Sequence, residues 1–255
     1  MIIPIMKILR AFAAALLLVP ALGFAAGTEV KLDHAPIDPT DRVSLQRGAH
    51  AFVNYCLNCH SASYMRYNRL QDLGLTEQQI RDNLIFTGVK VGELMKSSMD
   101  ASDAKQWFGT RPPDLSVTAR SRSSHAGPGS DWIYTYLRGF YRDPSRPTGW
   151  NNVVFPNVGM PHALWQLQGV QVLKETQEQA EGYMKTVQKL VIDKPGTMQP
   201  VEYDRFVADL VNYMTYMSEP ARAQRVTLGL YSLLVIFLLI ALSYALKKAF
   251  WKDVH

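Results

Sequence analysis

Two thiols and an imidazole, at Cys56, Cys59 and His60, are the groups in this chain with the clearest capacity for chemistry. Two cysteines three positions apart, followed at once by a histidine, form the attachment signature of a c-type haem. Each thiol adds across one vinyl group of the porphyrin, and the two-residue spacer lets both reach the ring from one turn of helix. The imidazole then lies under the ring, where its Nε2 can bind the iron. The spacing therefore predicts one covalent haem c with His60 as an axial ligand.

Two other interpretations of the motif find less support in the sequence. A zinc site would need two further ligands at similar spacing, and the chain has no third cysteine, so His125 and His162 would have to supply them. A redox-active cysteine pair follows a strand in a βαβ pattern, which is absent from this sequence. Because the bare motif also arises by chance in cytosolic chains, the haem interpretation depends on export.

The N-terminus predicts export through a signal peptide at residues 1–25. Lys7 and Arg10 precede an apolar run, and small residues follow it at 25–27. The run is about 14 residues, too short to cross a hydrocarbon core of roughly 30 Å, so a cleaved signal is favoured over a permanent anchor. Residues 26–221 then form a periplasmic domain, in which haem attachment uses both cysteines and leaves no disulfide.

The C-terminus predicts a membrane anchor. Residues 226–246 carry no charge, and at 1.5 Å per residue they span roughly 32 Å, the thickness of a bilayer core. Arg222 and Arg225 precede this run, and three lysines follow it. The positive-inside tendency keeps the lysine-bearing end in the cytoplasm. We therefore expect a single-pass protein of a bacterial inner membrane, with its anchor at 222–248 and a cytoplasmic tail at 249–255.

The charge balance excludes nucleic acid as a partner. The sequence pI is about 9.1, but much of the excess is targeting and topology charge. Without the signal and the charged tail, 22 basic and 21 acidic side chains remain among the 255 residues. An almost neutral exported domain has no phosphate-binding surface of the kind that DNA or RNA requires.

Two predicted helices frame the haem motif. The first runs from about Val43 to Tyr55 with Asp41 as its N-cap, and it leads directly into Cys56. Gly48 lies four positions before Phe52 on one side of this helix, which permits another helix to approach closely. The second predicted helix begins at Pro200 and ends near Ser218. Such a C-terminal helix closes the fold of small class I cytochromes.

The segments between these helices are less regular in their patterns. We expect Thr76 to begin a helix, and Asp131 to cap a short one, Trp132 to Phe140. Residues 163–198 are rich in Gln, Glu and Lys, and they indicate a surface insertion that forms a hairpin or a helix. Two adjacent prolines at 112–113 force an extended backbone, which can pack flat against a planar cofactor.

A loop around Met160 is the candidate source of the sixth iron ligand. A thioether on the far face of the ring must come from a chain that is neither helix nor strand, and Gly159 and Pro161 give the backbone that geometry. Methionine opposite histidine raises the reduction potential. His162 is the alternative, and it would give bis-histidine ligation with a lower potential.

Arg66 and Arg69 could face the haem propionates or be solvated surface charges.

Four sequence segments together resemble the cytochrome c1 family, the haem subunit of the ubiquinol–cytochrome c oxidoreductase (bc1) complex. They are Arg47-Gly48 ahead of the haem motif, Pro112-Pro113-Asp114-Leu115-Ser116, Gly159-Met160-Pro161, and Ser218-Glu219-Pro220 before the single span. The haem motif is common to all c-type cytochromes, whereas the second segment combined with a C-terminal anchor is more specific. The resemblance implies a mainly α fold: a class I-type cytochrome c domain with loop insertions, plus one C-terminal transmembrane helix.

The resemblance also implies roles for individual residues. The haem would be attached to Cys56 and Cys59. Its iron would be bound by His60 and Met160, and Pro113 would line the ring. The family has a propionate-binding arginine six residues beyond its Pro-Pro-Asp-Leu-Ser segment. Here that residue is Arg122, with Arg120 as a near rival. Two features depart from the family: no cysteine remains for the disulfide of some relatives, and the family's Met-Ala-Pro-like sequence is Met160-Pro161 here.

The function implied is transfer of single electrons from the Rieske iron–sulfur protein to cytochrome c, in a complex with cytochrome b. The chain would catalyse no reaction alone, because the quinol site belongs to a partner. The alternatives are a c-type haem subunit of a terminal oxidase or nitric-oxide reductase, and a haem enzyme or sensor with an open distal site. A methionine ligand argues against an open site, and the short tail leaves no room for a sensor's output domain.

Overall fold

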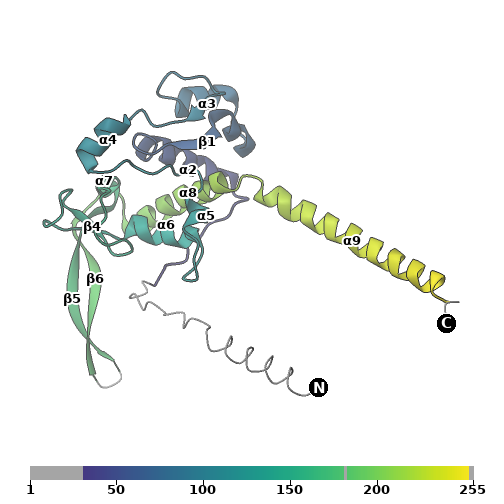
Figure 1. Cartoon of the computed structure of the whole chain (residues 1–255). Helices are drawn as coiled ribbons and strands as arrows, with labels where there is room; N and C mark the ends of the chain where they lie inside the picture. The colour runs from purple at the N-terminus through teal and green to yellow at the C-terminus, as the bar shows by residue number, and fades with distance from the viewer. Residues whose placement is uncertain (1–30, 181–182, 253–255) are drawn as a thin grey trace, which may run out of the picture. The chain divides into compact units, whose positions relative to one another are not determined.

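The computed structural model describes residues 31–180 and 183–252 (Figure 1). The predicted signal peptide, residues 1–25, lies outside the described residues. An irregular arm precedes the first described helix, α2 (Arg42–Tyr55). The Asp41 carboxylate caps this helix by accepting hydrogen bonds from the amides of Val43 and Ser44, both at 3.0 Å. The predicted helix and its N-cap are confirmed, because both depend on local sequence alone.

Helix α8 (Pro200–Ser218) packs against α2, and Figure 1 shows the two lying together. The contact is close because Gly48 has no side chain: a Cβ atom there would overlap the backbone oxygen of Asp209. The rings of Phe52 and Tyr213 meet beside this point, with centroids 5.6 Å apart. The predicted helix from Pro200 to Ser218 is confirmed. The prediction that another helix approaches α2 closely on the side of Gly48 and Phe52 is also confirmed.

The chain between α2 and α6 is a series of short elements. They are β1 (Ala62–Arg66), η1 (Tyr67–Leu73), α3 (Glu77–Leu84), β2 (Leu94–Met95), α4 (Ala101–Phe108) and α5 (Thr118–Ser121). Strands β1 and β2 pair antiparallel with an irregular register. Helix α3 begins with a capping box, in which Thr76 and Gln79 bond each other's backbone amides. The predicted helix start at Thr76 is confirmed.

Helix α6 (Gly129–Arg138) begins earlier than the sequence predicts. Asp131 is not its N-cap, and this prediction was wrong. The Asp131 side chain is buried inside the first turn, where its carboxylate accepts a hydrogen bond of 3.0 Å from the amide of Ala35 in the N-terminal arm. Pro128 occupies the cap position instead. The tertiary contact with the arm outweighs the local capping preference of aspartate.

Beyond α6 the chain forms a second, smaller apolar core. Strands β3 (Phe140–Arg142) and β4 (Trp150–Asn152) pair antiparallel, and the short helix α7 (Trp165–Gln168) follows. Phe140, Trp150 and Val158 are buried together there, with Tyr136 and Met160 packed against them. This cluster is separate from the main core around α2 and α8, and it supports the loop that carries Met160.

The predicted insertion at 163–198 forms mainly a two-stranded hairpin. Strands β5 (Gly169–Ala180) and β6 (Tyr183–Pro195) pair antiparallel and make the long ribbon of Figure 1. Helix α9 (Arg222–Phe250) follows α8 and includes the stretch Gln224–Phe250, which is long and apolar enough to cross a membrane. The predicted fold class, mainly α with loop insertions and a C-terminal apolar helix, is confirmed.

Candidate functional site

The two thiols lie on one turn at the end of α2. Cys56 is the C-cap of the helix, and its amide donates to the oxygen of Phe52 at 2.9 Å. The amides of Cys59 and His60 then both donate to the Cys56 oxygen, at 3.1 and 2.8 Å. Leu57, inside the turn, is buried in the main core and fixes it there. A closed turn of this kind holds both thiols and the imidazole within reach of one planar group.

Both cysteines are free and half-buried. Burial, with a smaller contribution from the neighbouring Cys59 thiol, raises the pKa of Cys56 to about 12. Burial likewise raises the pKa of Cys59. The two groups are therefore neutral thiols at neutral pH, the form that adds hydrogen and sulfur across a vinyl double bond.

The His60 ring is held in one orientation and one tautomer. Its Nδ1 lies 2.7 Å from the carbonyl oxygen of Pro113, so Nδ1 carries the proton and donates it. Burial lowers the pKa of His60, and the bond to Pro113 and the charge of Asp114 oppose this only in part. The imidazole is therefore neutral at neutral pH, with the Nε2 lone pair available to a metal. A carbonyl on the second ring nitrogen is the usual support of a metal-binding histidine.

Pro113 is itself held by a ladder of hydrogen bonds to the chain that follows the haem motif. The amide of Leu115 donates to the oxygen of Ser61 at 2.8 Å. The Asp114 carboxylate accepts from the amides of Ser63 and Ser116, both at 2.8 Å. Burial raises the pKa of Asp114, but hydrogen bonds from Ser116 and Ser63 outweigh it and hold that pKa below its usual range. The extended proline pair predicted from the sequence thus lies directly against His60.

The loop of Met160 lies near the chain that leads to the proline pair. A Cβ atom on Gly159 would lie 3.9 Å from the Phe108 oxygen and 4.0 Å from Thr110 Cγ2, on the chain that leads to Pro113. The Met160 sulfur accepts a hydrogen bond of 3.4 Å from the hydroxyl of Tyr136. Burial raises the pKa of Tyr136 strongly, so its hydroxyl keeps the proton that it donates. Tyr136 was not among the predicted site residues; the only signal for it in the sequence is the run of aromatic residues on α6, which includes Trp132 and Tyr134.

His162, the rival ligand, lies within the second core. Its ring stacks on Phe140, with centroids 4.8 Å apart and an interplanar angle of 3°, and meets Trp150 edge-on at 5.1 Å. Burial lowers its pKa to about 4. Its Nε2 has no hydrogen-bond partner among the residues that the structure describes. To reach an iron, His162 would have to leave this stack, whereas Met160 lies at the edge of the same cluster.

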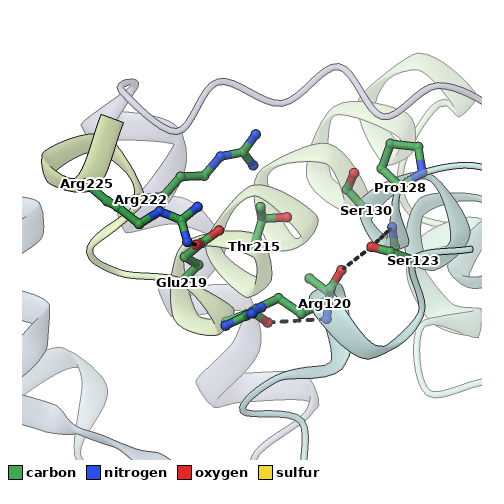
Figure 2. A pocket seen from close by; sticks show the side chains of 11 residues that line it. Arg120, Ser123, Pro128, Ser130, Thr215, Glu219, Arg222 and Arg225 are labelled. Atoms are coloured by element: carbon green, nitrogen blue, oxygen red, sulfur yellow. Dashed lines mark hydrogen bonds and ion pairs between the residues drawn. The ribbon is translucent and has the colours of Figure 1, made fainter. Parts of the chain in front are cut away.

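The structure separates the two candidate propionate arginines. The Arg122 guanidinium lies 4.3 Å from the centroid of the Trp132 ring, and Trp132 stacks on Tyr136 at 4.9 Å. Arg122 thus belongs to the aromatic group that contacts Met160. Arg120 instead lines a pocket near the start of α9, as Figure 2 shows.

The other two arginines considered for the propionates are engaged close to their own positions. Arg66 donates to the oxygen of Gly92 at 2.8 Å, and Arg69 pairs with Asp72 at 2.7 Å.

The donors in this region fit a covalent haem. Two thiols share one turn. Beside them, the bond from His60 Nδ1 to Pro113 leaves the lone pair of His60 Nε2 free to bind a metal. The Met160 thioether is held by the Tyr136 hydroxyl. Arg122 adds a positive charge on an aromatic surface. A mainly helical domain with a Cys-x-x-Cys-His turn at the end of its first described helix defines the class of c-type haem proteins.

Comparison with known proteins identifies the family within that class. The sequence model of the Cytochrome C1 family matches residues 33–254, so the chain belongs to the cytochrome c1 family. A cytochrome c1 of Allochromatium vinosum is 46% identical over 94% of this chain and 96% of its own length. A Rhodospirillum rubrum cytochrome c1 is 27% identical over 84% of this chain and 83% of its own length.

A third relative has a different name. The ammonia monooxygenase gamma subunit of Nitrosomonas europaea is 51% identical over 98% of this chain and 100% of its own length.

Proteins of the cytochrome c1 family carry one covalently bound haem c, and they are electron-transfer subunits of the bc1 complex. The predicted family and cofactor are confirmed.

Proposed function

We propose that this chain takes single electrons from the Rieske iron–sulfur protein and delivers them to cytochrome c, in a bc1 complex in which it assembles with cytochrome b. Membership of the cytochrome c1 family supports the complex. The observation that carries the proposal is the fixed His60 imidazole, bonded to the Pro113 oxygen at 2.7 Å directly after the two thiols. When bound, the haem supplies a one-electron iron couple.

In this proposal each residue has a distinct role. Cys56 and Cys59 attach the haem through thioether bonds, and His60 presents Nε2 to the iron. Pro113 orients the imidazole through its carbonyl and lines the ring. Met160 would present its sulfur as the second ligand, from the loop that Tyr136 supports. Arg122 pairs with a propionate, supported by its place beside Trp132 and Tyr136.

A closed coordination site distinguishes an electron carrier from a haem enzyme or sensor. Tyr136 is packed between Trp132 and Phe140, and its hydroxyl holds the Met160 sulfur. This aromatic packing partly buries the thioether. His60 and Met160 would together hold a bound haem iron, which would leave no coordination site for a substrate or small ligand, and electron transfer would require no exchange of ligands.

The proposal includes a membrane topology. A signal at residues 1–25 is cleaved, residues 26–221 form the periplasmic haem domain, 222–248 anchor it, and 249–255 remain in the cytoplasm. The uncharged stretch within α9 and the lysines after it support this orientation. The anchor then serves assembly with cytochrome b.

A reduced-minus-oxidised optical spectrum tests the site, with carbon monoxide added to the wild type and to Met160→Leu. We expect one c-type haem that ignores carbon monoxide in the wild type and binds it in the variant. Met198→Leu, which changes a partly buried methionine packed on the main core, is the matched control and should behave as the wild type. A wild type that binds carbon monoxide readily contradicts the closed site. If the Met160→Leu haem does not bind carbon monoxide, Met160 is not the ligand and His162 is the remaining candidate.

One observation favours a second candidate function. The Nitrosomonas relative named as an ammonia monooxygenase subunit covers almost the whole chain, so the same haem could serve a monooxygenase assembly. Purification of the tagged chain from its own membranes separates the two. Co-purified b-type haem and quinol-dependent reduction of cytochrome c support the bc1 assignment. Co-purification with ammonia-oxidising activity, and without these, supports the other.

A further inference from the structure

A basic pocket lies where the helical domain meets the first turn of α9 (Figure 2). It encloses about 370 Å³. Arg120 enters from α5, Arg222 and Arg225 enter from α9, and Glu219 is in the turn between α8 and α9. The remaining lining comes from α5 and the loop after it, the start of α6 and the end of α8. Arg120 was the rival of Arg122 for a haem propionate, but the haem site proposed above uses Arg122 and none of the residues that line this pocket.

The charges of the pocket are not balanced within the chain. Arg225 is paired with Glu219 at 2.5 Å. In the described ranges 31–180 and 183–252, neither Arg120 nor Arg222 has an ion-pair or hydrogen-bond partner for its guanidinium. Three arginines face one glutamate, so the pocket has a net positive charge of two. Paired guanidinium groups match the oxygens of a phosphate in shape and charge.

The pocket walls are fixed by bonds inside the fold. The Ser218 hydroxyl donates to the Met214 oxygen at 2.9 Å and accepts from the amide of Ala119 at 3.3 Å. The Ser123 hydroxyl accepts from the amide of Gly129 at 3.0 Å. These hydroxyls are already used, so the donors available to a ligand are the two unpaired arginines. The walls therefore form a rigid frame around a pair of free cations.

The position of the pocket along the chain identifies the ligand. Arg222 and Arg225 precede or begin the apolar stretch Gln224–Phe250. If this stretch spans a bilayer, as proposed above, its first turn lies at the level of the lipid headgroups. Arginines on the translocated side run against the positive-inside tendency, and an anionic group at the membrane surface attracts and neutralises such cations. The partner with matching charge at that depth is an anionic phospholipid.

We infer that the pocket formed by Arg120, Arg222 and Arg225 binds the phosphodiester headgroup of an anionic phospholipid of the outer leaflet. This inference rests on the proposed topology of α9, but it does not depend on the haem ligands. The bound lipid neutralises the two free arginines and ties the haem domain to the membrane surface. Zwitterionic lipids carry the same phosphate with an adjacent cation, so they bind this net positive pocket less well.

The test is a binding titration of the full-length, haem-loaded chain in neutral detergent, followed by isothermal calorimetry. The probes are dihexanoyl phosphatidylglycerol, dihexanoyl phosphatidylcholine and inorganic phosphate. Loss of one charge-assisted phosphate contact weakens binding by about tenfold. We therefore expect Arg222→Gln and Arg120→Gln each to bind the phosphatidylglycerol about tenfold more weakly than the wild type. Arg205→Gln, which removes an exposed arginine of α8 outside the pocket, should bind it unchanged.

Each other outcome overturns the inference. Equal binding by wild type and both pocket variants removes the pocket as the site. Equal affinity for the two lipids removes the charge argument. Competition by inorganic phosphate at the affinity of the lipid makes the ligand a free anion. The haem spectrum of every variant is recorded in parallel, so a wrong haem assignment appears there and leaves the lipid result independent.

Discussion

Replacement of Gly48 by alanine should destabilise the domain at the contact between α2 and α8. The added Cβ atom would overlap the Asp209 oxygen and lie 2.7 Å from both the Asp209 carbonyl carbon and the Tyr213 Cβ. These are backbone or near-backbone atoms of a 19-residue helix, so no flexible side chain can move aside. The two helices must separate, and the contact between the rings of Phe52 and Tyr213 loosens with them.

The size of the effect follows from two opposing terms. Alanine favours a helix interior over glycine by about 1 kcal/mol, whereas extra atoms in a packed interface cost about 1–3 kcal/mol. Because the obstacle is backbone, the upper end applies, and we expect a net loss of about 2 kcal/mol in the free energy of unfolding. For a domain of this size that lowers Tm by about 4–8 °C.

Thermal unfolding of the haem-loaded full chain, followed by circular dichroism and by the Soret band, measures this loss. Gly92→Ala is the matched control, because a Cβ atom there would meet nothing within 4 Å. Asp209→Ala removes only the ion pair with the largely exposed Arg47, which contributes about 1 kcal/mol or less. A double variant at 48 and 209 should stay destabilised, since the overlap is with backbone. A stable Gly48→Ala, or a double variant restored to wild-type stability, would refute the reasoning.

Two further predictions concern the distal side of the site. Tyr136→Phe removes the hydrogen bond to the Met160 sulfur, worth about 1 kcal/mol, and should lower about fivefold the imidazole concentration that displaces Met160 from the oxidised haem in an optical titration. Tyr141→Phe is the control and should titrate as the wild type; equal midpoints for the two variants would contradict the role of Tyr136. Burial lowers the pKa of His162 from 6.5 to about 4, so the stability that its neutral ring provides is complete above pH 6.5 and declines as the pH falls toward 4. The unfolding free energy should drop by about 2 kcal/mol between pH 7 and pH 5 in urea titrations, and His162→Phe, which keeps the stack on Phe140, should remove most of that drop.

Local signals explain the parts of the fold that the sequence predicts. The caps at Asp41 and Thr76 and the proline at 200 act within one turn of chain, so the helices they begin are found where expected. Asp131 fails as a cap because its carboxylate bonds an amide 96 positions away. No pattern near residue 131 contains that contact.

In the candidate site, too, the features set by local sequence could be predicted and those set by long-range contacts could not. The haem motif is readable because its chemistry depends on spacing alone, and Pro113 because two prolines fix the backbone. The contact of Tyr136 with Met160 joins residues 24 positions apart, on different elements, so composition could only mark the stretch as aromatic. Arg120 and Arg122 differ by two positions at α5, and residues two apart on a helix do not face the same way. That divergence explains why the two arginines meet different surroundings.

In the proposed topology, the pairing of α2 with α8 also bears on the order of events during export. The ion pair between Arg47 and Asp209 joins positions 162 apart, and α8 is followed within a few residues by the apolar helix α9. A chain exported N-terminus first would present Cys56 and Cys59 long before α8 emerged to cover α2. Haem attachment would then take place on an open α2 with accessible thiols. The domain would close over its cofactor only when the chain is about to be held by its own C-terminal helix.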